Sequence, residues 1–265
     1  DKLKVITRPG VGYDSVDVEA ATERGIPVVL CPSANARAVA EATLTLMFAC
    51  AKNLVESVTE TRKGNFNIRN KYAAVDIVDK KMVLLGFGHI GKLVAELCAA
   101  LSMKIGVYDP YVAKDAVEAM GYTYYAELND ALADADFVSL HMPSTPTTRG
   151  MISTEQFKAM KPTAFFLNAA RGDVVDEPAM IEALKAGEIA GAGLDVLAEE
   201  PMPADSPLMS MPNVVITPHM AAQTQETVAK LVTMAAEGTL AVLRGEKWPH
   251  VANPEVYNHP KWAGK

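Results

Sequence analysis

The chain has few cysteines, no run of basic residues and no long apolar segment, and each absence excludes a class of protein. Its three cysteines, Cys31, Cys50 and Cys98, show no CxxC spacing, so neither a disulfide framework, a zinc site nor any other metal site is predicted. A formal charge of −7 without a basic cluster argues against nucleic acid as a partner. No apolar stretch approaches the ~20 residues of a membrane span, and no signal peptide is visible. We therefore expect a cytoplasmic protein that binds neither membranes nor nucleic acid.

The length of 265 residues and the hydrophobic share of 49% suit one large α/β domain or two lobes with a buried core. The chain begins without methionine and runs straight into a strand-like segment, LKVIT, so we expect further residues upstream. Residues 1–38 form a short βαβ-like opening that is too small to stand alone. We expect them to be part of a small lobe, 39–221 to be the main domain, and 222–265 to be a closing helix and an extended tail that return to the small lobe.

One segment, residues 82–109, carries the pattern of a nucleotide-binding βαβ unit. A short apolar strand leads into Gly86, Gly88 and Gly91, which open a helix with an apolar face, and a second strand ends on Asp109. The first glycine permits a tight turn, the second lets a pyrophosphate approach the backbone, and the third allows close helix–strand packing. Asp109 lies 18 residues after Gly91. A carboxylate at this spacing accepts hydrogen bonds from ribose hydroxyls and repels a 2′-phosphate, so the pattern predicts NAD rather than NADP. A glycine-rich turn without a ligand is the alternative for the glycines alone.

Strand-like and helix-like segments then alternate along the rest of the main domain. The expected strands lie at 137–140, 164–168, 190–196 and 214–216, and a helix at 178–186 ends at Gly187. This alternation predicts an α/β fold with a Rossmann-type doubly wound parallel sheet.

The segment 39–55 is apolar nearly all round, which a surface helix cannot be. We interpret it as one helix that crosses between the lobes, buried on two sides, and that packs against a second subunit. The sequence therefore predicts a homodimer.

Three charged residues follow three consecutive strands of the expected sheet: Arg171, Glu200 and His219. Because ligands of open α/β sheets lie beyond the carboxyl ends of the strands, these side chains are expected to converge where the nicotinamide lies. Oxidation of a hydroxyl with NAD needs a base, a cation that holds a carboxylate, and a carbon placed against the ring. Each residue has a structural alternative: His219 as a structural residue after a proline, Arg171 as a cap of a surface loop, and Glu200 as one of a solvated pair with Glu199. Their joint placement favours the chemical interpretation.

Motifs over nearly the whole chain resemble those of the D-isomer-specific 2-hydroxyacid dehydrogenases, a family that includes phosphoglycerate dehydrogenases and glyoxylate or hydroxypyruvate reductases. These motifs are RPGVGYDSVD, GIPVVLCPSA, AVAEAT, LLGFGHIG, HMPSTPTTRG, FFLNAARGDVVDE, GAGLDVLAEEP and ITPHMA. The resemblance implies hydride transfer between NAD and C2 of a small D-2-hydroxy or 2-oxo acid. It also implies a smaller, flavodoxin-like substrate lobe, incomplete here because the family carries a few tens of further N-terminal residues.

The resemblance assigns roles to individual residues as well. Arg171 binds the 2-oxo and carboxylate oxygens of the substrate, His219 is the acid/base, and Glu200 hydrogen-bonds the histidine and favours its protonated form. The backbone N–H groups of Val11 and Gly12 form the substrate carboxylate cradle. The implied cofactor contacts are Cys31, Gly86, Gly88, His89, Ile90, Gly91, Asp109, Met142, Ala169, Ala170, Arg171, Asp195, His219 and Met220.

Two other functions stay open at this point. One is formate or phosphite oxidation within the same family, although formate dehydrogenases place Gln where Glu200 stands. The other is a non-enzymatic NAD-sensing scaffold like the C-terminal-binding-protein corepressors, although the chain shows no evident peptide-docking extension. The sequence does not indicate which 2-oxo acid is the substrate.

Overall fold

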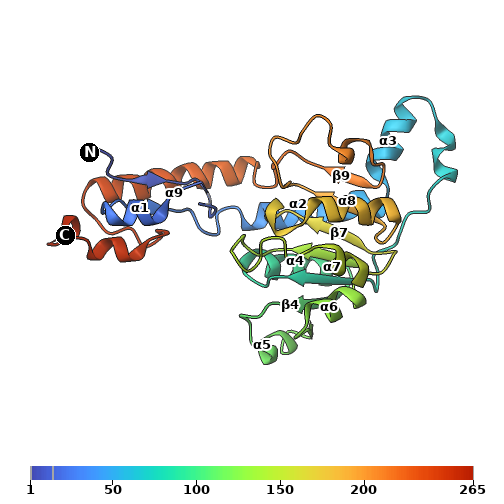
Figure 1. Ribbon diagram of the computed structural model, residues 1–265, viewed down its shortest axis with the longest axis horizontal. Helices are drawn as coiled ribbons and strands as arrows, with labels where there is room; N and C mark the ends of the chain where they lie inside the picture. The colour runs from blue at the N-terminus through green and yellow to red at the C-terminus, as the bar shows by residue number, and fades with distance from the viewer. Residues whose placement is uncertain (1, 14, 265) are drawn as a thin grey trace. The chain divides into compact units, whose positions relative to one another are not determined.

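The computed structural model describes residues 2–13 and 15–264, and the chain divides into two compact units. Unit 1 comprises residues 1–38 and 222–265, and unit 2 comprises residues 39–221. The first and last segments of the chain therefore belong to one unit, where the blue and the red ribbons lie side by side in Figure 1.

Unit 2 is built on a seven-stranded parallel sheet in the order β5-β4-β3-β6-β7-β8-β9. The strands are β3 (Lys81–Leu85), β4 (Lys104–Tyr108), β5 (Thr123–Tyr124), β6 (Phe137–Leu140), β7 (Phe165–Asn168), β8 (Gly191–Leu194) and β9 (Val214–Ile216). The chain builds outward from β3 to β5, returns to β6 and then builds outward in the other direction, so a topological switch point lies between β3 and β6. The predicted doubly wound parallel sheet is confirmed.

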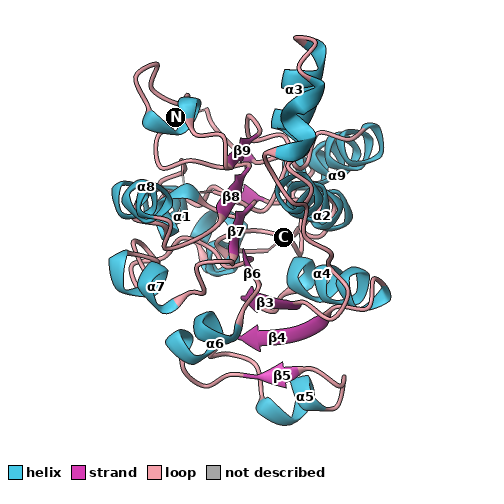
Figure 2. Ribbon diagram, turned by 90° about the vertical axis from the view of Figure 1, so that its right-hand side faces the viewer, coloured by secondary structure: helices cyan, strands magenta, loops and turns pink. Residues whose placement is uncertain are grey.

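Helices cover both faces of this sheet, as Figure 2 shows. One face is covered by α2 (Ala36–Ala51), α4 (His89–Ala100) and α5 (Lys114–Glu118), and the other by α6 (Leu128–Asp134), α7 (Thr154–Ala159) and α8 (Glu177–Ala186). Two apolar cores result, one on each face. Burial on both faces explains why β6 and β7 are apolar along nearly their whole length.

The prediction of one helix over residues 39–55 is wrong. The helix α2 ends at Ala51, and α3 (Leu54–Arg62) starts after Asn53, whose φ is 47°. Asparagine tolerates this left-handed conformation, which ends the first helix, and the two helices meet at 62°. The helix α2 is largely buried, whereas α3 buries none of its residues. Within the described residues no single helix is long and apolar enough to cross a membrane, and α2 and α3 pass that test only as a bent pair.

Unit 1 holds a two-stranded parallel sheet, β1 (Ile6–Thr7) with β2 (Val28–Val29), and the helices α1 (Val18–Glu23) and α9 (Gln225–Leu243). The prediction of an extended tail is wrong, because the tail contains two 3-10 helices, η4 (Pro254–Asn258) and η5 (Pro260–Trp262). They form because the tail has apolar side chains to bury, and Trp262 is 5% exposed. Three further 3-10 turns lie in unit 2: η1 (Phe66–Asn70), η2 (Gly172–Val174) and η3 (Pro207–Ser210).

Candidate active site

Three loops at the carboxyl end of the unit 2 sheet carry an arginine, a carboxylate and a histidine. Arg171 follows β7, Glu200 lies in the loop after β8, and His219 follows β9. The distance between His219 Nδ1 and Glu200 Oε2 is 2.7 Å, and the two side chains are 55% and 36% exposed. Both line a cavity of about 610 Å³. Its other walls come from Asp195, Leu197, Pro201, Met202, Ile216, Thr217 and Pro218.

The backbone orients the Glu200 carboxylate. Its Oε1 accepts a hydrogen bond from the Leu197 N–H at 3.0 Å, which leaves Oε2 for the imidazole. A carboxylate acceptor at Nδ1 favours the tautomer that carries its proton there. The ring atom left for a ligand is then Nε2, so His219 can exchange a proton at Nε2 while Glu200 holds the ring.

Asp195 fixes the loop that carries His219. Its carboxylate is 2% exposed and accepts bonds from Thr217 Oγ1 at 2.6 Å and from the N–H groups of Met220 and Ala221 at 2.9 Å each. The Asp195 carbonyl accepts from the His219 N–H at 2.8 Å. His219 itself has a positive φ of 52°, a conformation that is uncommon for residues other than glycine. The resemblance pointed only to a cofactor contact for Asp195, and no local sequence pattern indicated this anchoring.

The loop of Arg171 is packed directly against the loop of Glu200. A Cβ at Gly172 would lie 1.8 Å from the Leu197 carbonyl oxygen, so only glycine permits this approach. On the other side, the buried Asn168 accepts from the Ala170 N–H at 2.9 Å and donates to the Arg171 carbonyl at 2.9 Å. Arg171 Nη1 donates to the Ala170 carbonyl at 2.7 Å. These contacts place the guanidinium loop beside the loop that carries the histidine's partner.

The three glycines after β3 have different surroundings. Gly86 has φ of 101°, and a Cβ there would meet the His141 carbonyl at 2.7 Å; a Cβ at Gly91 would meet the Gly86 carbonyl at 2.4 Å. A Cβ at Gly88 would meet nothing within 4 Å. The first and third glycines are thus required by the chain's own packing, whereas the second borders open space at the start of α4. That space, beside a helix N-terminus, fits a pyrophosphate.

His141 lies against the loop that carries these glycines. Burial lowers the pKa of His141 to about 4, so the ring is uncharged near pH 7. Its Nε2 lies 2.9 Å from Ser139 Oγ. His89 is exposed and Ile90 is half-buried in the first turn of α4, and Met142, the second residue after β6, is half-buried.

The remaining predicted residues are placed as follows. Val11, Gly12 and Cys31 belong to unit 1, where the Gly12 carbonyl accepts from Arg8 Nε at 3.1 Å and the Cys31 N–H donates to the Gly10 carbonyl at 2.9 Å. Cys31 is buried, and its burial raises the pKa of the thiol. In unit 2, Ala169 and Ala170 are half-buried after β7, and Met220 is 48% exposed.

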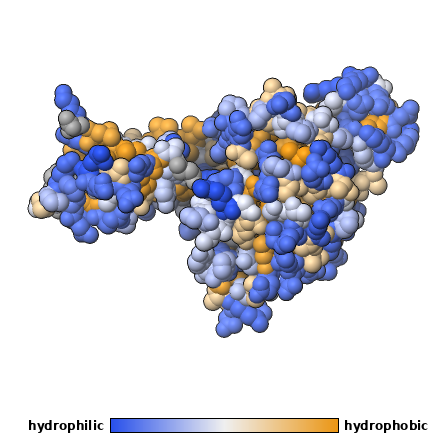
Figure 3. Space-filling view, viewed as in Figure 1, coloured by the Kyte–Doolittle hydropathy of each residue, from blue (hydrophilic) through white to orange (hydrophobic). Residues whose placement is uncertain are grey.

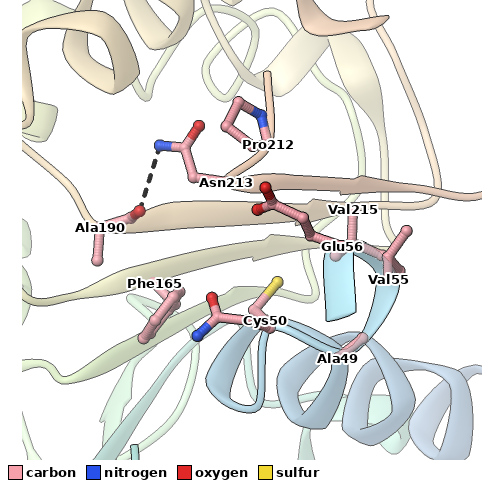
Figure 4. Close-up of a pocket in the computed structure, with 10 residues that line it drawn as sticks. Ala49, Cys50, Val55, Glu56, Phe165, Ala190, Pro212, Asn213 and Val215 are labelled. Carbon is pink, nitrogen blue, oxygen red and sulfur yellow. Dashed lines mark hydrogen bonds between the residues drawn. The ribbon is translucent and has the colours of Figure 1, made fainter. Parts of the chain in front are cut away.

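Figure 4 shows a second recess in unit 2, at the amino ends of β7, β8 and β9, the opposite edge of the sheet from His219. Its volume is only about 30 Å³. Asn213 Nδ2 donates to the Ala190 carbonyl at 3.2 Å across it. Burial raises the pKa of Cys50, which also lines it, to about 12. A thiol that stays protonated is a poor nucleophile.

Within residues 2–13 and 15–264, no three histidine, cysteine or acidic side chains are placed to hold a metal ion.

The chain is similar to a set of known oxidoreductases. Residues 44–221 match the family model described as the NAD-binding domain of D-isomer-specific 2-hydroxyacid dehydrogenases. A D-3-phosphoglycerate dehydrogenase from Methanocaldococcus jannaschii is 44% identical over 96% of this chain and 48% of that protein. A glyoxylate reductase from Korarchaeum cryptofilum is 39% identical over 96% of this chain and 77% of that protein. The structure of a D-lactate dehydrogenase with NAD+ from Lactobacillus jensenii has a TM-score of 0.81 and 35% identity, over 94% of this chain and 78% of that one. The chain spans about half the length of the D-3-phosphoglycerate dehydrogenases it matches.

Proposed function

The chain belongs to the D-isomer-specific 2-hydroxyacid dehydrogenase family, and we propose that it is part of an NAD-dependent enzyme that interconverts a small D-2-hydroxy acid and its 2-oxo acid. The observation that carries the proposal is the 2.7 Å contact between His219 and Glu200 beside the arginine loop. NADH, when bound, supplies the hydride that the 2-oxo acid receives at C2.

The residues of this chain would perform the remaining tasks. His219 donates a proton from Nε2 to the substrate oxygen during reduction and accepts it during oxidation. Glu200 holds Nδ1 and stabilises the imidazolium by its charge. Arg171 binds the substrate carboxylate, for which a planar guanidinium is suited, and the N–H groups of Val11 and Gly12 are assigned to the same carboxylate. The cofactor contacts proposed are those predicted from the sequence, with Gly88 at the pyrophosphate and Asp109 at the ribose.

A substrate panel tests the reaction. We expect NADH oxidation with at least one of glyoxylate, hydroxypyruvate and 3-phosphohydroxypyruvate, measured on the protein with any upstream residues it naturally carries. NAD reduction by formate is the control for the other reaction of the family. Formate oxidation is not favoured, because a carboxylate, Glu200, is in direct contact with the histidine where formate dehydrogenases place Gln. A purely NAD-sensing role is not favoured, because the relatives described above are named as a dehydrogenase and a reductase. NADH binding without turnover of any of the three 2-oxo acids would contradict the proposal.

Cofactor preference gives a second prediction. Because a carboxylate at the end of β4 repels a 2′-phosphate, NADH should bind at least tenfold more tightly than NADPH, a difference of about 1.4 kcal/mol. Asp109→Ser should reduce the ratio of the two affinities. Titration of protein fluorescence with each cofactor measures both dissociation constants. Equal affinities of the unmutated protein would refute the assignment of Asp109 to the ribose.

The role of Glu200 is tested by substitution. In Glu200→Gln the negative charge beside the imidazole is lost, and the amide N–H₂ faces Nδ1 if its oxygen keeps the bond to the Leu197 N–H. Both changes disfavour imidazolium, the form that donates the proton in reduction. The value of kcat/KM for reduction should therefore fall, by roughly tenfold or more, because the hydrogen bond to a charged partner is lost. Glu199→Gln is the matched control with the same charge change. A loss of kcat/KM that is no larger in Glu200→Gln than in Glu199→Gln would show that Glu200 is not the partner.

We also propose a cytoplasmic homodimer with the segment 39–55 at or beside the two-fold axis. Exposed apolar side chains support the assembly: Leu54 and Val55 on α3 are 52% and 50% exposed, and Phe66 in η1 is 70% exposed. Apolar surface is also visible over α9 in Figure 3. On this helix, Val232 is 62% exposed. Light scattering at micromolar concentration should give twice the mass of the chain, and Val55→Lys should lower it. A stable monomer in the unmutated protein would contradict the proposal.

A further inference from the structure

The Asp109 carboxylate is bonded to the glycine loop itself. Its Oδ2 accepts from the Phe87 N–H at 2.7 Å, and its Oδ1 accepts from the Tyr111 N–H at 2.9 Å. Phe87 stands between the first two glycines of the loop, 22 residues before Asp109 in the sequence. A carboxylate has about four acceptor positions, so two remain for ribose hydroxyls after both backbone bonds are made.

Phe87 connects the loop to the body of unit 2. Its side chain is 2% exposed and its ring packs edge-on against Tyr122, with the ring centroids 6.2 Å apart. Lys92 of α4 also contacts this ring, with its Nζ 5.8 Å from the Phe87 ring centroid. The Phe87 side chain is therefore fixed by packing, and the bond from the Phe87 N–H to Asp109 fixes the orientation of the peptide that joins Gly86 to Phe87.

We propose that Asp109 is a positioning residue for the glycine loop, residues 86–91, in addition to its contact with the ribose. The proposal rests on the proposed dinucleotide binding. With the Gly86–Phe87 peptide held by the carboxylate and the Phe87 side chain held by packing, the backbone that enters Gly88 and the first N–H groups of α4 are already oriented when a diphosphate arrives. A loop ordered before binding loses less conformational freedom on binding, so the ligand binds more tightly. Asp109 then strengthens the binding of ligands that have no ribose hydroxyls for it to contact.

The test uses two ligands that differ only in those hydroxyls, ADP and 2′,3′-dideoxy-ADP, with calorimetric titration of the unmutated protein and Asp109→Ala. If Asp109 positions the loop, the variant binds dideoxy-ADP more weakly, by roughly three- to tenfold. If Asp109 acts on the ribose alone, only the affinity for ADP falls. The sign is informative, because removing a negative charge near an anionic ligand would by itself strengthen binding. An affinity for dideoxy-ADP that is unchanged or higher in Asp109→Ala overturns the proposal.

Two further variants sharpen the comparison. Asp115→Ala removes the same charge from an exposed carboxylate at the start of α5, and it should bind both ligands like the unmutated protein. Asp109→Asn keeps one acceptor oxygen, so its affinity for dideoxy-ADP should lie between those of the unmutated protein and Asp109→Ala.

Hydrogen exchange gives a readout that needs no ligand. The Phe87 amide should exchange faster in Asp109→Ala than in the unmutated protein, while the amides of β3 keep their protection. Equal protection of Phe87 in both proteins overturns the proposal. Failure of the unmutated protein to bind either ADP or NADH would instead refute the proposed function, and the exchange experiment would still decide whether Asp109 orders the loop.

Discussion

Replacement of His219 by asparagine is expected to lower kcat for 2-oxo acid reduction by roughly 10²–10⁴-fold, the usual contribution of a positioned acid/base. Asparagine is the appropriate substitution because residue 219 has a positive φ of 52°, which asparagine adopts more readily than alanine. The backbone bond from residue 219 to the Asp195 carbonyl can therefore persist. The change removes the proton donor and leaves the loop in place.

Steady-state kinetics with a saturating 2-oxo acid measures the loss, and titration with NADH serves as the control. NADH affinity should change far less than kcat, since proton transfer is made only in the reaction. A kcat within a few-fold of that of the unmutated protein would show that another group supplies the proton. An equal loss of NADH binding would show that the loop, rather than the chemistry, had been damaged.

Replacement of Gly172 by alanine is expected to cause the largest loss of stability of any single methyl group added at the site, about 3 kcal/mol or more. The added Cβ would lie 1.8 Å from the Leu197 carbonyl oxygen. Neither atom can rotate away, because the Cβ is bonded directly to the Cα of residue 172 and the oxygen is part of the backbone. Relief requires the loops of Arg171 and Glu200 to separate. The same substitution should therefore lower activity.

Thermal unfolding measures the effect, with an expected fall of roughly 6–12 °C in Tm. Gly88→Ala is the matched control because its Cβ meets nothing within 4 Å, and its Tm should stay within about 1 °C of the unmutated value. A fall in Tm no larger for Gly172→Ala than for Gly88→Ala would show that the two loops adjust to the methyl group at little cost.

The sheet could be predicted because its strands are short runs of apolar residues bounded by clear turns. The strands β6 and β9 have the predicted bounds. The elements that the sequence did not indicate are short and partly polar: β5 has two residues and α7 has six, too few for a periodic pattern. The break between α2 and α3 depends on the φ of one residue, Asn53, within a segment whose composition remains apolar on both sides.

The candidate site divides in the same way. Arg171, Glu200 and His219 could be found because chemistry in parallel sheets lies after the strands, and each follows one. The anchoring by Asp195 could not, because its carboxylate bonds to residues 22 to 26 positions later, and only the pairing of β8 with β9 brings them together. The bond from Asp109 to Phe87 likewise depends on the pairing of β3 with β4.

The open space at Gly88 shows that the three glycines of the loop are required for two different reasons, folding and ligand binding. Folding constrains Gly86 and Gly91, because a side chain at either would collide with backbone. At Gly88 the chain itself makes no such demand, so only a ligand that approaches the backbone would keep a side chain out. A descendant protein that had stopped using a dinucleotide could therefore accept alanine or serine at 88 and still fold. In such a lineage a substitution is expected first at position 88, whereas Gly86 and Gly91 should remain glycine because folding requires them.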